Sequence, residues 1–311
     1  MLKTLRIATR KSALAQLQAA MVKRKIETAF PEMDIQYVNC STAGDEIQNR
    51  PLAEIGGKGL FIKSLEEALL GGSADLAVHS LKDVPSLISD EFSLMAFVER
   101  ENPFDVMLSQ QFKSLADLPL FARVGTSSPR RSAQLKWLRP DLRIALLRGN
   151  VPTRVEKVMN QELDAGIFAY AGLARLGLTE KIRQIFPPNT LLPAPGQGII
   201  VVECLRAREA EFKALISVLN DTKLEKMALA ERAFAARLSG DCYSAIAAVS
   251  EVNGDQLKLR GAVYSKGGET ALFGSKILDL SAEVDAFEAL GQALADELLG
   301  RGARELLCFN K

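Results

Sequence analysis

Apolar runs of strand length alternate with amphipathic stretches of helix length over the first two thirds of this chain, and this alternation constrains the fold more than any other feature. The first predicted elements are a strand at 5–9, a helix from Ser12, a strand at 35–40, a helix at 61–70 and a strand at 75–80. The residues expected on the buried face of the first helix are Leu14, Leu17, Met21, Val22 and Ile26. Strands joined through helices form a largely parallel sheet, so the sequence predicts an α/β lobe.

A second series of elements begins near Asn102 and predicts another α/β lobe. Its members are a strand at 106–109, a strand ending at Val124, a helix entered through Ser128 and Pro129, a strand at 144–147, a helix from Val151 and a strand at 166–170. Serine followed by proline is a strong helix-start signal. The apolar stretch 199–204 could cross back and complete the first sheet.

The character of the chain changes beyond about Asn220. A helix at 224–238, strands divided by turn signals at 253–255 and 266–268, and a helix at 281–299 predict a small α+β domain. The predicted fold class is α/β, with two periplasmic-binding-protein-like lobes around a cleft and this small C-terminal α+β domain. The expected domains are 1–98 with 199–218, then 99–198, then 219–311.

Composition excludes several classes of function. The 39 basic residues nearly balance the 38 acidic ones, so no global field draws the chain to nucleic acid or to an anionic membrane. The N-terminus lacks the apolar core of a signal peptide, and we expect a soluble, cytoplasmic protein. Four widely spaced cysteines and a single histidine, His79, argue against a zinc site and against a Ser/His/Asp triad built elsewhere.

Short stretches that combine basic and small polar residues follow several predicted strands. Ligands of open α/β sheets lie beyond the carboxyl ends of the strands, and guanidinium groups bind carboxylate or phosphate through two parallel hydrogen bonds. A ligand with several negative charges is therefore expected. Its candidate partners are Arg10, Ser12, Lys58, Ser80, Lys82, Thr126, Ser127, Ser128, Arg130, Arg131, Arg148 and Arg154. For each residue taken singly, the alternative is a solvated surface charge or a helix cap.

Asp83 is an acidic residue among cations and should stay ionised, which suits pairing with a positive intermediate. Alternatively, it pairs with Lys82 or caps the turn before Pro85. His79, at the end of an apolar strand, favours a hydrogen-bonded structural role over catalysis.

Two further segments leave alternatives open. The run GGKGLF at 56–61 lacks the length and the hydroxyl residue of a P-loop, and a flap that closes over a cleft is an equal interpretation. Cys242 lies in a turn, where it could be a nucleophile, an attachment point or a plain turn residue.

Taken together and in order, these segments resemble the porphobilinogen deaminase family, also called hydroxymethylbilane synthase, over essentially the full length. The segments that carry the resemblance are RIATRKSALA, GGKGLF, AVHSLKDVP, GTSSPRR, LRGNVPTR, AGLARLG, PGQG and the late cysteine. The resemblance implies a transferase of tetrapyrrole (haem) biosynthesis. It would condense four porphobilinogen molecules head to tail, with loss of ammonia, to give hydroxymethylbilane.

The same resemblance implies the site. A dipyrromethane cofactor would be held through a thioether at Cys242, and Asp83 would be catalytic, stabilising the cation formed as ammonia leaves. The implied substrate- and cofactor-binding residues are Arg10, Ser12, Lys58, Phe61, Ser80, Lys82, Thr126, Ser127, Ser128, Arg130, Arg131, Arg148, Gly149, Arg154, Arg175 and Gln197. Porphobilinogen is the expected small-molecule partner, and a monomer without a metal is expected.

The chain departs from the family pattern at the cofactor-bearing turn. That turn usually has the form GGCxxP, whereas this chain has GDCYSA, with Asp241 and Ala245 at the changed positions. Asp241 would raise the thiol pKa of Cys242 and repel carboxylates of the cofactor. The competing class is a non-catalytic, anion-binding receptor of periplasmic-binding-protein architecture. The expected third domain and the lack of an export signal count against that class.

Overall fold

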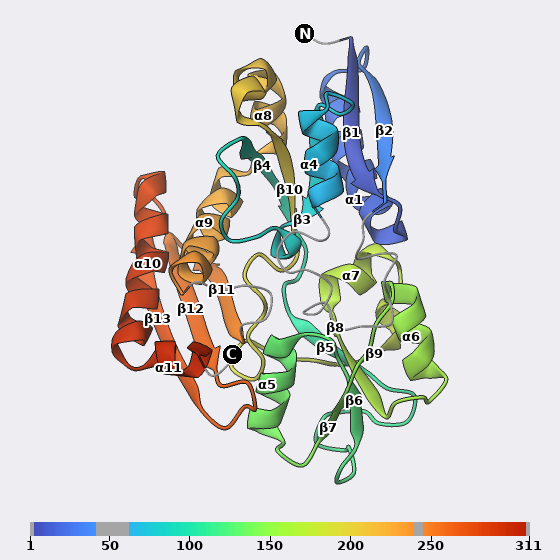
Figure 1. Ribbon diagram of the computed structural model, residues 1–311, viewed down its shortest axis with the longest axis vertical. Coiled ribbons are helices and arrows are strands. Elements are labelled where there is room, and N and C mark those ends of the chain that lie inside the picture. Colours follow the sequence, from blue (N-terminus) through green and yellow to red (C-terminus); the bar gives the residue numbers. More distant parts are fainter. Residues whose placement is uncertain (1–2, 42–61, 239–244, 309–311) are drawn as a thin grey trace. The chain divides into compact units, whose positions relative to one another are not determined.

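The computed structural model describes residues 3–41, 62–238 and 245–308. The chain forms two compact units (Figure 1), one made of residues 1–101 and 198–225 and the other of residues 102–197 and 226–311. The second unit contains two separate sheets. The predicted boundaries of three domains stay a prediction.

The first unit contains a five-stranded sheet in the order β2-β1-β3-β10-β4. Its strands are β1 (Thr4–Arg10), β2 (Asp34–Cys40), β3 (Leu76–Ser80), β4 (Phe92–Arg100) and β10 (Ile199–Leu205). Its helices are α1 (Ala13–Ala29), α4 (Lys63–Leu70), α8 (Lys213–Leu219) and the 3₁₀ helices η1 (Leu81–Asp83) and η3 (Arg206–Phe212), and α9 (Thr222–Arg237) leads onward. Alternate residues of the strands face opposite layers, with α1 and α8 packed on one face and α4 on the other.

Helix α1 begins where the sequence predicts, but its buried face differs. Ser12 is the N-cap, and its side chain accepts a hydrogen bond from the backbone N–H of Ala15. Leu17, which was expected to be buried, is 40% exposed. Val22 and Ile26 are buried as expected, Leu14 and Met21 are half-buried, and Ala15, Gln18 and Ala19 complete the buried stripe. The small alanines let the helix approach the sheet closely, which leucine at the same contact would prevent.

The returning strand β10 is confirmed as a member of the first sheet, where it lies between β3 and β4. The expectation of a largely parallel sheet is confirmed for β1, β2 and β3, and β4 runs in the same direction, because β3 and β4 are both antiparallel to β10; β10 is the reversed strand of this sheet. No helical crossover brings β10 back from the second unit, so its direction is reversed. Strand β4 was not predicted, because the prediction relied on strands that alternate with α-helices and no α-helix lies between β3 and β4.

The second unit begins with a five-stranded sheet in the order β7-β6-β8-β5-β9. Its strands are β5 (Asp105–Leu108), β6 (Arg123–Gly125), β7 (Arg143–Ala145), β8 (Ala165–Ala169) and β9 (Ile182–Ile185). Its helices are α5 (Pro129–Leu138), α6 (Val151–Met159), α7 (Tyr170–Arg175) and the 3₁₀ helix η2 (Thr179–Lys181). Strands β6, β7 and β8 are parallel, but β5 runs antiparallel to β8 and β9, so this sheet is mixed as well.

The C-terminal part of this unit is the predicted small α+β domain. Antiparallel strands β11 (Ile246–Asn253), β12 (Gln256–Tyr264) and β13 (Ala271–Asp279) form its sheet, and α10 (Val284–Gly300) and α11 (Ala303–Cys308) follow. One face of the sheet packs on α9 and α10. The other face packs on Ala133 of α5 and on Leu192. The C-terminal sheet therefore supports the helix that carries two candidate arginines.

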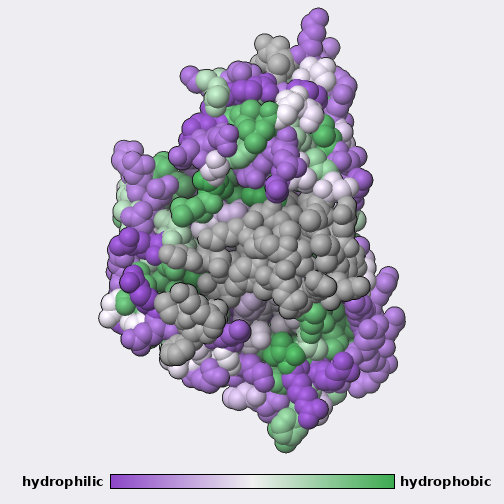
Figure 2. Space-filling view, in the orientation of Figure 1, coloured by the Kyte–Doolittle hydropathy of each residue, from purple (hydrophilic) through white to green (hydrophobic). Residues whose placement is uncertain are grey.

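The face of the molecule shown in Figure 2 is mostly hydrophilic where its residues are described. On the face shown in Figure 2, hydrophobic residues form small separate patches among hydrophilic ones. Exposed apolar residues scattered in this way are ordinary for a globular protein. Within residues 3–41, 62–238 and 245–308, no helix has the length and apolar character needed to cross a membrane.

Asp75 is the charged centre of the first unit. Its carboxylate is 4% exposed and accepts hydrogen bonds from Arg6 (Nε at 3.0 Å, Nη2 at 2.9 Å and the backbone N–H at 2.9 Å) and from Nη1 of Arg208 (2.8 Å). Burial raises the pKa of Asp75, but the hydrogen bonds from Arg6 and Arg208 outweigh it and hold the pKa below its ordinary value. The carboxylate thus joins β1, the start of β3 and η3.

Asp75→Asn should lower the free energy of unfolding at pH 7 by about 2 kcal/mol, because a buried charge-assisted network loses its anion while water still reaches the arginines. Since the folded pKa lies below the unfolded one, the carboxylate contributes fully above about pH 4 and loses its contribution as pH falls through the folded pKa. Urea denaturation at about pH 7 and about pH 3 should show a smaller gap between wild type and variant at the lower pH. An equal gap would contradict this account.

Candidate functional site

The candidates of the first unit follow two adjacent parallel strands. Arg10 ends β1, Ser80 ends β3, and the two strands are parallel neighbours, so these residues lie at the same edge of the sheet. Nε2 of Gln18 in α1 donates to Oγ of Ser80 at 2.7 Å, which fixes α1 against this edge. Ser12 caps α1 at the same edge. This geometry brings Arg10, Ser12 and Ser80 together with Lys82 and Asp83 of η1, as expected from the sequence.

Asp83 is half-buried at the end of the 3₁₀ helix η1. Among the described residues its carboxylate makes no hydrogen bond and no ion pair, so it neither pairs with Lys82 nor caps the turn before Pro85. A half-buried carboxylate normally has a partner, because burial of a charge without one is costly. Within the described residues Asp83 therefore has no structural partner, and its carboxylate is open to a ligand.

His79 is buried and hydrogen-bonded, in keeping with the structural role favoured from the sequence. Its Nε2 lies 2.9 Å from Oε2 of Glu203, a fully buried residue of the neighbouring strand β10. The pair joins β3 to β10 directly before the segment that leads to Asp83.

The candidates of the second unit follow the parallel strands β6, β7 and β8. Thr126, Ser127 and Ser128 connect β6 to α5, while Arg148 and Gly149 connect β7 to α6. Oγ of Ser127 donates to the backbone carbonyl of Leu147 at 2.6 Å, so the two loops are hydrogen-bonded to each other. The predicted strand-end loops of this unit are therefore close together at one edge of the sheet.

The three hydroxyl groups after β6 differ in whether their proton is still available for a hydrogen bond to a ligand. The proton of Ser127 is used in the bond to Leu147. Oγ1 of Thr126 accepts from the backbone N–H of Ser128, and Oγ of Ser128 accepts from the N–H of Arg131 as the N-cap of α5. In these two bonds the oxygen is the acceptor, so the hydroxyl protons of Thr126 and Ser128 remain able to donate to an acceptor such as a carboxylate.

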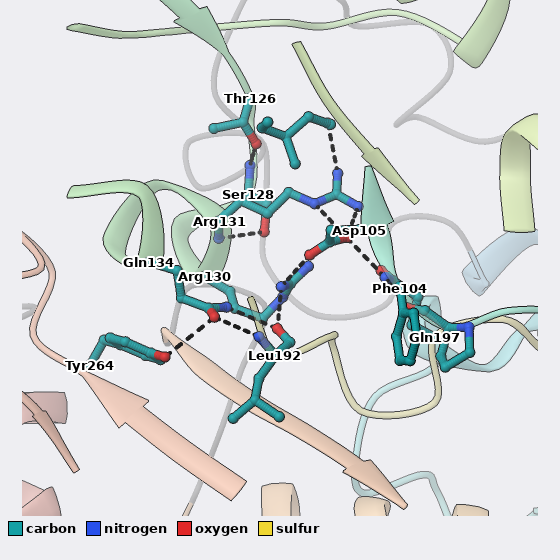
Figure 3. A network of polar contacts seen from close by, with 12 residues as sticks. Phe104, Asp105, Thr126, Ser128, Arg130, Arg131, Gln134, Leu192, Gln197 and Tyr264 are labelled. Atoms are coloured by element: carbon teal, nitrogen blue, oxygen red, sulfur yellow. Dashed lines mark hydrogen bonds and ion pairs between the residues drawn. The ribbon is translucent and has the colours of Figure 1, made fainter. Parts of the chain in front are cut away.

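Arg130 and Arg131 point into the interior of their unit (Figure 3), where they are 4% and 6% exposed. Asp105, the first residue of β5, lies between them. Its Oδ2 accepts from Nη1 of Arg130 at 2.6 Å, and its Oδ1 accepts from Nε (3.0 Å) and Nη2 (2.7 Å) of Arg131. Burial raises the pKa of Asp105, but the charges of the two arginines outweigh it and hold the pKa far below its ordinary value. At neutral pH the carboxylate is therefore ionised and neutralises one of the two arginine charges.

The remaining candidates of this unit occupy helix ends and strand ends. Gly149 has φ of 110°, a conformation that favours glycine, and it precedes Asn150, the N-cap of α6. The guanidinium of Arg154 lies 5.6 Å from the centre of the Phe168 ring. Arg175 ends α7. Nε2 of Gln197 donates to the carbonyl of Pro103 at 2.6 Å and to Oδ1 of Asp105 at 2.9 Å.

Three residues of this network were not singled out from the sequence, namely Asp105, Gln134 and Tyr264. Asp105 could have been found, because an acidic residue at the start of a wholly apolar strand needs a buried partner. Gln134 and Tyr264 carry no such signal, since their role depends on contacts that the sequence does not show.

Lys58, Phe61 and Cys242 lie outside the described residues. The candidates form one group in each unit, and the expectation that both groups share a cleft with Cys242 stays a prediction. The role of each predicted residue in ligand binding likewise stays a prediction at this point.

Two family models match this chain. The model of "Porphobilinogen deaminase, dipyromethane cofactor binding domain" matches residues 5–213, and that of "Porphobilinogen deaminase, C-terminal domain" matches residues 225–300. The curated porphobilinogen deaminase of Geotalea uraniireducens is 45% identical over 98% of this chain and 94% of that protein. That of Citrifermentans bemidjiense is 44% identical over the same shares. Among solved structures, the periplasmic aliphatic sulphonate binding protein of Escherichia coli is 18% identical, with a TM-score of 0.43, and the match covers 77% of this chain and 70% of that chain.

The cap of α5 gives a test of the local geometry. Ser128→Ala should lower the free energy of unfolding by about 1 kcal/mol, because the N–H of Arg131 loses its acceptor, and Ser128→Asn should restore the cap. Ser132→Ala on the same helix is the matched control, since the described chain shows no hydrogen bond from that side chain and alanine favours helix. Urea denaturation measures all three. A loss with Ser132→Ala as large as with Ser128→Ala would contradict the assignment of the cap.

Proposed function

The chain belongs to the porphobilinogen deaminase family, and on that premise we propose that it joins four porphobilinogen molecules head to tail on a dipyrromethane primer and yields hydroxymethylbilane. It is an enzyme of the transferase class with a dipyrromethane cofactor, rather than a non-catalytic receptor. In each proposed step, the bond between the aminomethyl carbon and nitrogen breaks and a carbon–carbon bond to the next pyrrole forms. The nitrogen leaves as ammonia, and the proton lost from the pyrrole carbon balances the one that the leaving amine takes up.

The residues proposed to bind the cofactor fit a group that carries carboxylates. Nε of Arg130 is buried and has no hydrogen-bond partner within the described part of the chain, and the hydroxyl protons of Thr126 and Ser128 are available in the same segment. These groups are hydrogen-bond donors without acceptors, and a carboxylate can accept from them. When bound, the dipyrromethane supplies the pyrrole carbon that attacks the first substrate. We propose Cys242 as its attachment point.

The main support for the proposal is the half-buried carboxylate of Asp83, which has no partner among the described residues. Loss of ammonia leaves positive charge on the substrate pyrrole, and a fixed carboxylate beside that charge stabilises it without reorganisation. Asp83 is half-buried, is held on a 3₁₀ turn directly after a buried strand, and has no partner among the residues described. It can therefore accept pyrrole N–H groups and move protons without first breaking a structural bond.

The candidate arginines have a complementary role in this proposal. Each porphobilinogen brings one acetate and one propionate, so negative charge accumulates as the product grows, and guanidinium groups neutralise it by bidentate pairing. Holding the primer on the protein makes each condensation effectively unimolecular, which can contribute about 7 to 11 kcal/mol in well-oriented cases. Binding and positioning thus account for much of the proposed rate enhancement.

Intact mass of the purified protein tests the attachment. The wild-type chain should carry the mass of two pyrrole units, and Cys242→Ser should have the mass of the bare polypeptide. Cys40→Ala is the control, because Cys40 is buried and its thiol pKa is raised by burial, so it should keep the added mass. A wild-type chain at the bare polypeptide mass would contradict the proposed function.

A second prediction concerns Asp83. Asp83→Asn should reduce kcat by about 100-fold or more, because the preorganised charge is lost, and should leave the melting temperature close to that of wild type. Asp90→Asn is the control, since Asp90 is exposed and the Arg206 bond uses its backbone carbonyl, which the substitution keeps. Kinetics and thermal denaturation of both variants measure the effect. Wild-type turnover in Asp83→Asn would remove Asp83 from the mechanism.

A further inference from the structure

The two arginines at the start of α5 differ in the hydrogen bonds that they can still make. All three side-chain nitrogens of Arg131 have acceptors, two on Asp105 and the third, from Nη1, on the carbonyl of Ile167 at 3.1 Å. Arg130 is held by Nη1 alone, which donates to Oδ2 of Asp105 and to the carbonyl of Leu192, each at 2.6 Å. Its buried Nε has no partner, and none is found for Nη2 either, within the residues that the structure describes.

The unpaired nitrogens Nε and Nη2 form one edge of the planar guanidinium of Arg130. That edge matches the two oxygens of a carboxylate, whereas the equivalent edge of Arg131 is already used by Asp105. A buried donor without an acceptor is costly, so such groups normally bond to protein or to ordered water, and an edge that lacks a protein acceptor points to a functional role. The Arg130 edge is thus open to an acceptor that the described residues do not supply.

Gln134 fixes the orientation of the Leu192 carbonyl, one of the two acceptors that bind Nη1 of Arg130. Its side-chain amide pairs with both backbone groups of Leu192, accepting from the N–H at 2.8 Å and donating to the carbonyl at 2.9 Å (Figure 3). Tyr264, on β12 of the C-terminal sheet, donates to the same Oε1 of Gln134 at 3.3 Å. The carbonyl of Leu192 is therefore fixed in direction before it accepts from Nη1 of Arg130.

Strand direction explains why Asp105 can reach the site. Because β5 runs antiparallel to β8, its first residue Asp105 pairs with Ala169, the last residue of β8. The amino end of β5 therefore lies at the edge where the parallel strands end, which is the edge that carries the candidate loops. In a parallel β5, the same residue would lie at the opposite edge of the sheet.

We infer that Asp105 and Gln134 are positioning residues that hold Arg130 by Nη1 and so keep its Nε and Nη2 edge available for a carboxylate of the cofactor or substrate. This inference rests on the proposed function, which supplies the carboxylate. Planarity makes the arrangement effective, because two acceptors on one nitrogen fix the plane and the direction of the whole guanidinium. Neither positioning residue needs to touch the ligand.

The main test is Gln134→Met, which keeps the volume of the side chain and removes the amide. The carbonyl of Leu192 then loses its fixed direction, and the KM for porphobilinogen should rise about tenfold with little change in kcat, the size of one hydrogen bond to a charged group. Intact mass should also show a smaller fraction of chains that carry the two pyrrole units. This second measurement does not depend on the activity of the loaded enzyme.

Gln184→Met is the matched control. The Gln184 amide also bonds to backbone in the same unit, accepting from the N–H of Leu115 at 2.7 Å, but among the described residues it makes no hydrogen bond to Leu192. Its KM and its loaded fraction should match those of wild type. If Gln184→Met changed both as much as Gln134→Met does, a general loss of stability would explain the result and the inference would be overturned.

Asp105→Asn gives the stronger form of the test, with Asp75→Asn as its control. Both substitutions remove a buried carboxylate shared by two arginines, so both should lower stability, but only Asp105→Asn should lower the loaded fraction of the folded protein. Wild-type KM and loading in Gln134→Met would overturn the inference and leave the proposed function intact. A wild-type chain without added pyrroles would overturn the proposed function and this inference with it.

Discussion

The buried carboxylate of Asp105 is the interaction on which the candidate site of the second unit depends. Two guanidinium groups cannot be buried side by side without an anion between them, because their repulsion and their desolvation both oppose folding. Asp105 supplies that anion and leaves one net positive charge. It also accepts from Nε2 of Gln197, which donates to the carbonyl of Pro103 as well, so Gln197 joins the segment before β10 to Asp105 and to the segment before β5. A single acid thereby fixes the position of α5, the charge of the site and the path of the chain.

The first unit contains the same kind of shared carboxylate with a different result. Asp75 lies between Arg6 and Arg208, but these arginines are 37% and 26% exposed and every oxygen of Asp75 is used within the fold. Asp75 precedes β3, so it lies at the amino end of a parallel strand, away from the edge where ligands bind in such sheets. Asp75 is therefore structural and Asp105 a positioning residue because of where each lies in its sheet, and not because their ion pairs differ in kind.

The chemistry proposed for the family divides naturally between these two groups. The first unit contributes Asp83, a carboxylate without a partner in the described chain, for positive charge on the substrate. The second contributes buried cations and hydroxyl donors for the negative charge of the product. The first group also contains the partly exposed cations Arg10 and Lys82, whereas Asp105, the acid of the second group, is fully buried between two arginines. Within the described chain, the carboxylate of Asp83 and the Nε of Arg130 are available to ligand groups of opposite sign, and this supports the proposed transfer of acidic pyrroles.

The amino-acid sequence by itself determined most of the elements and the chemistry of the loops, because helix caps such as Ser12 and Ser128 and the strand at 199–204 are local patterns of a few residues. It also determined the family, through motifs that occur in order along the chain. Only the tertiary structure decided that β5 and β10 run antiparallel to their neighbours and that Leu17 is exposed. It also decided that Nε and Nη2 of Arg131 donate to Asp105, whereas the same two nitrogens of Arg130 have no acceptor among the described residues. Strand direction and the partner of a buried charge are set by residues far apart in the sequence, so no local pattern contains them.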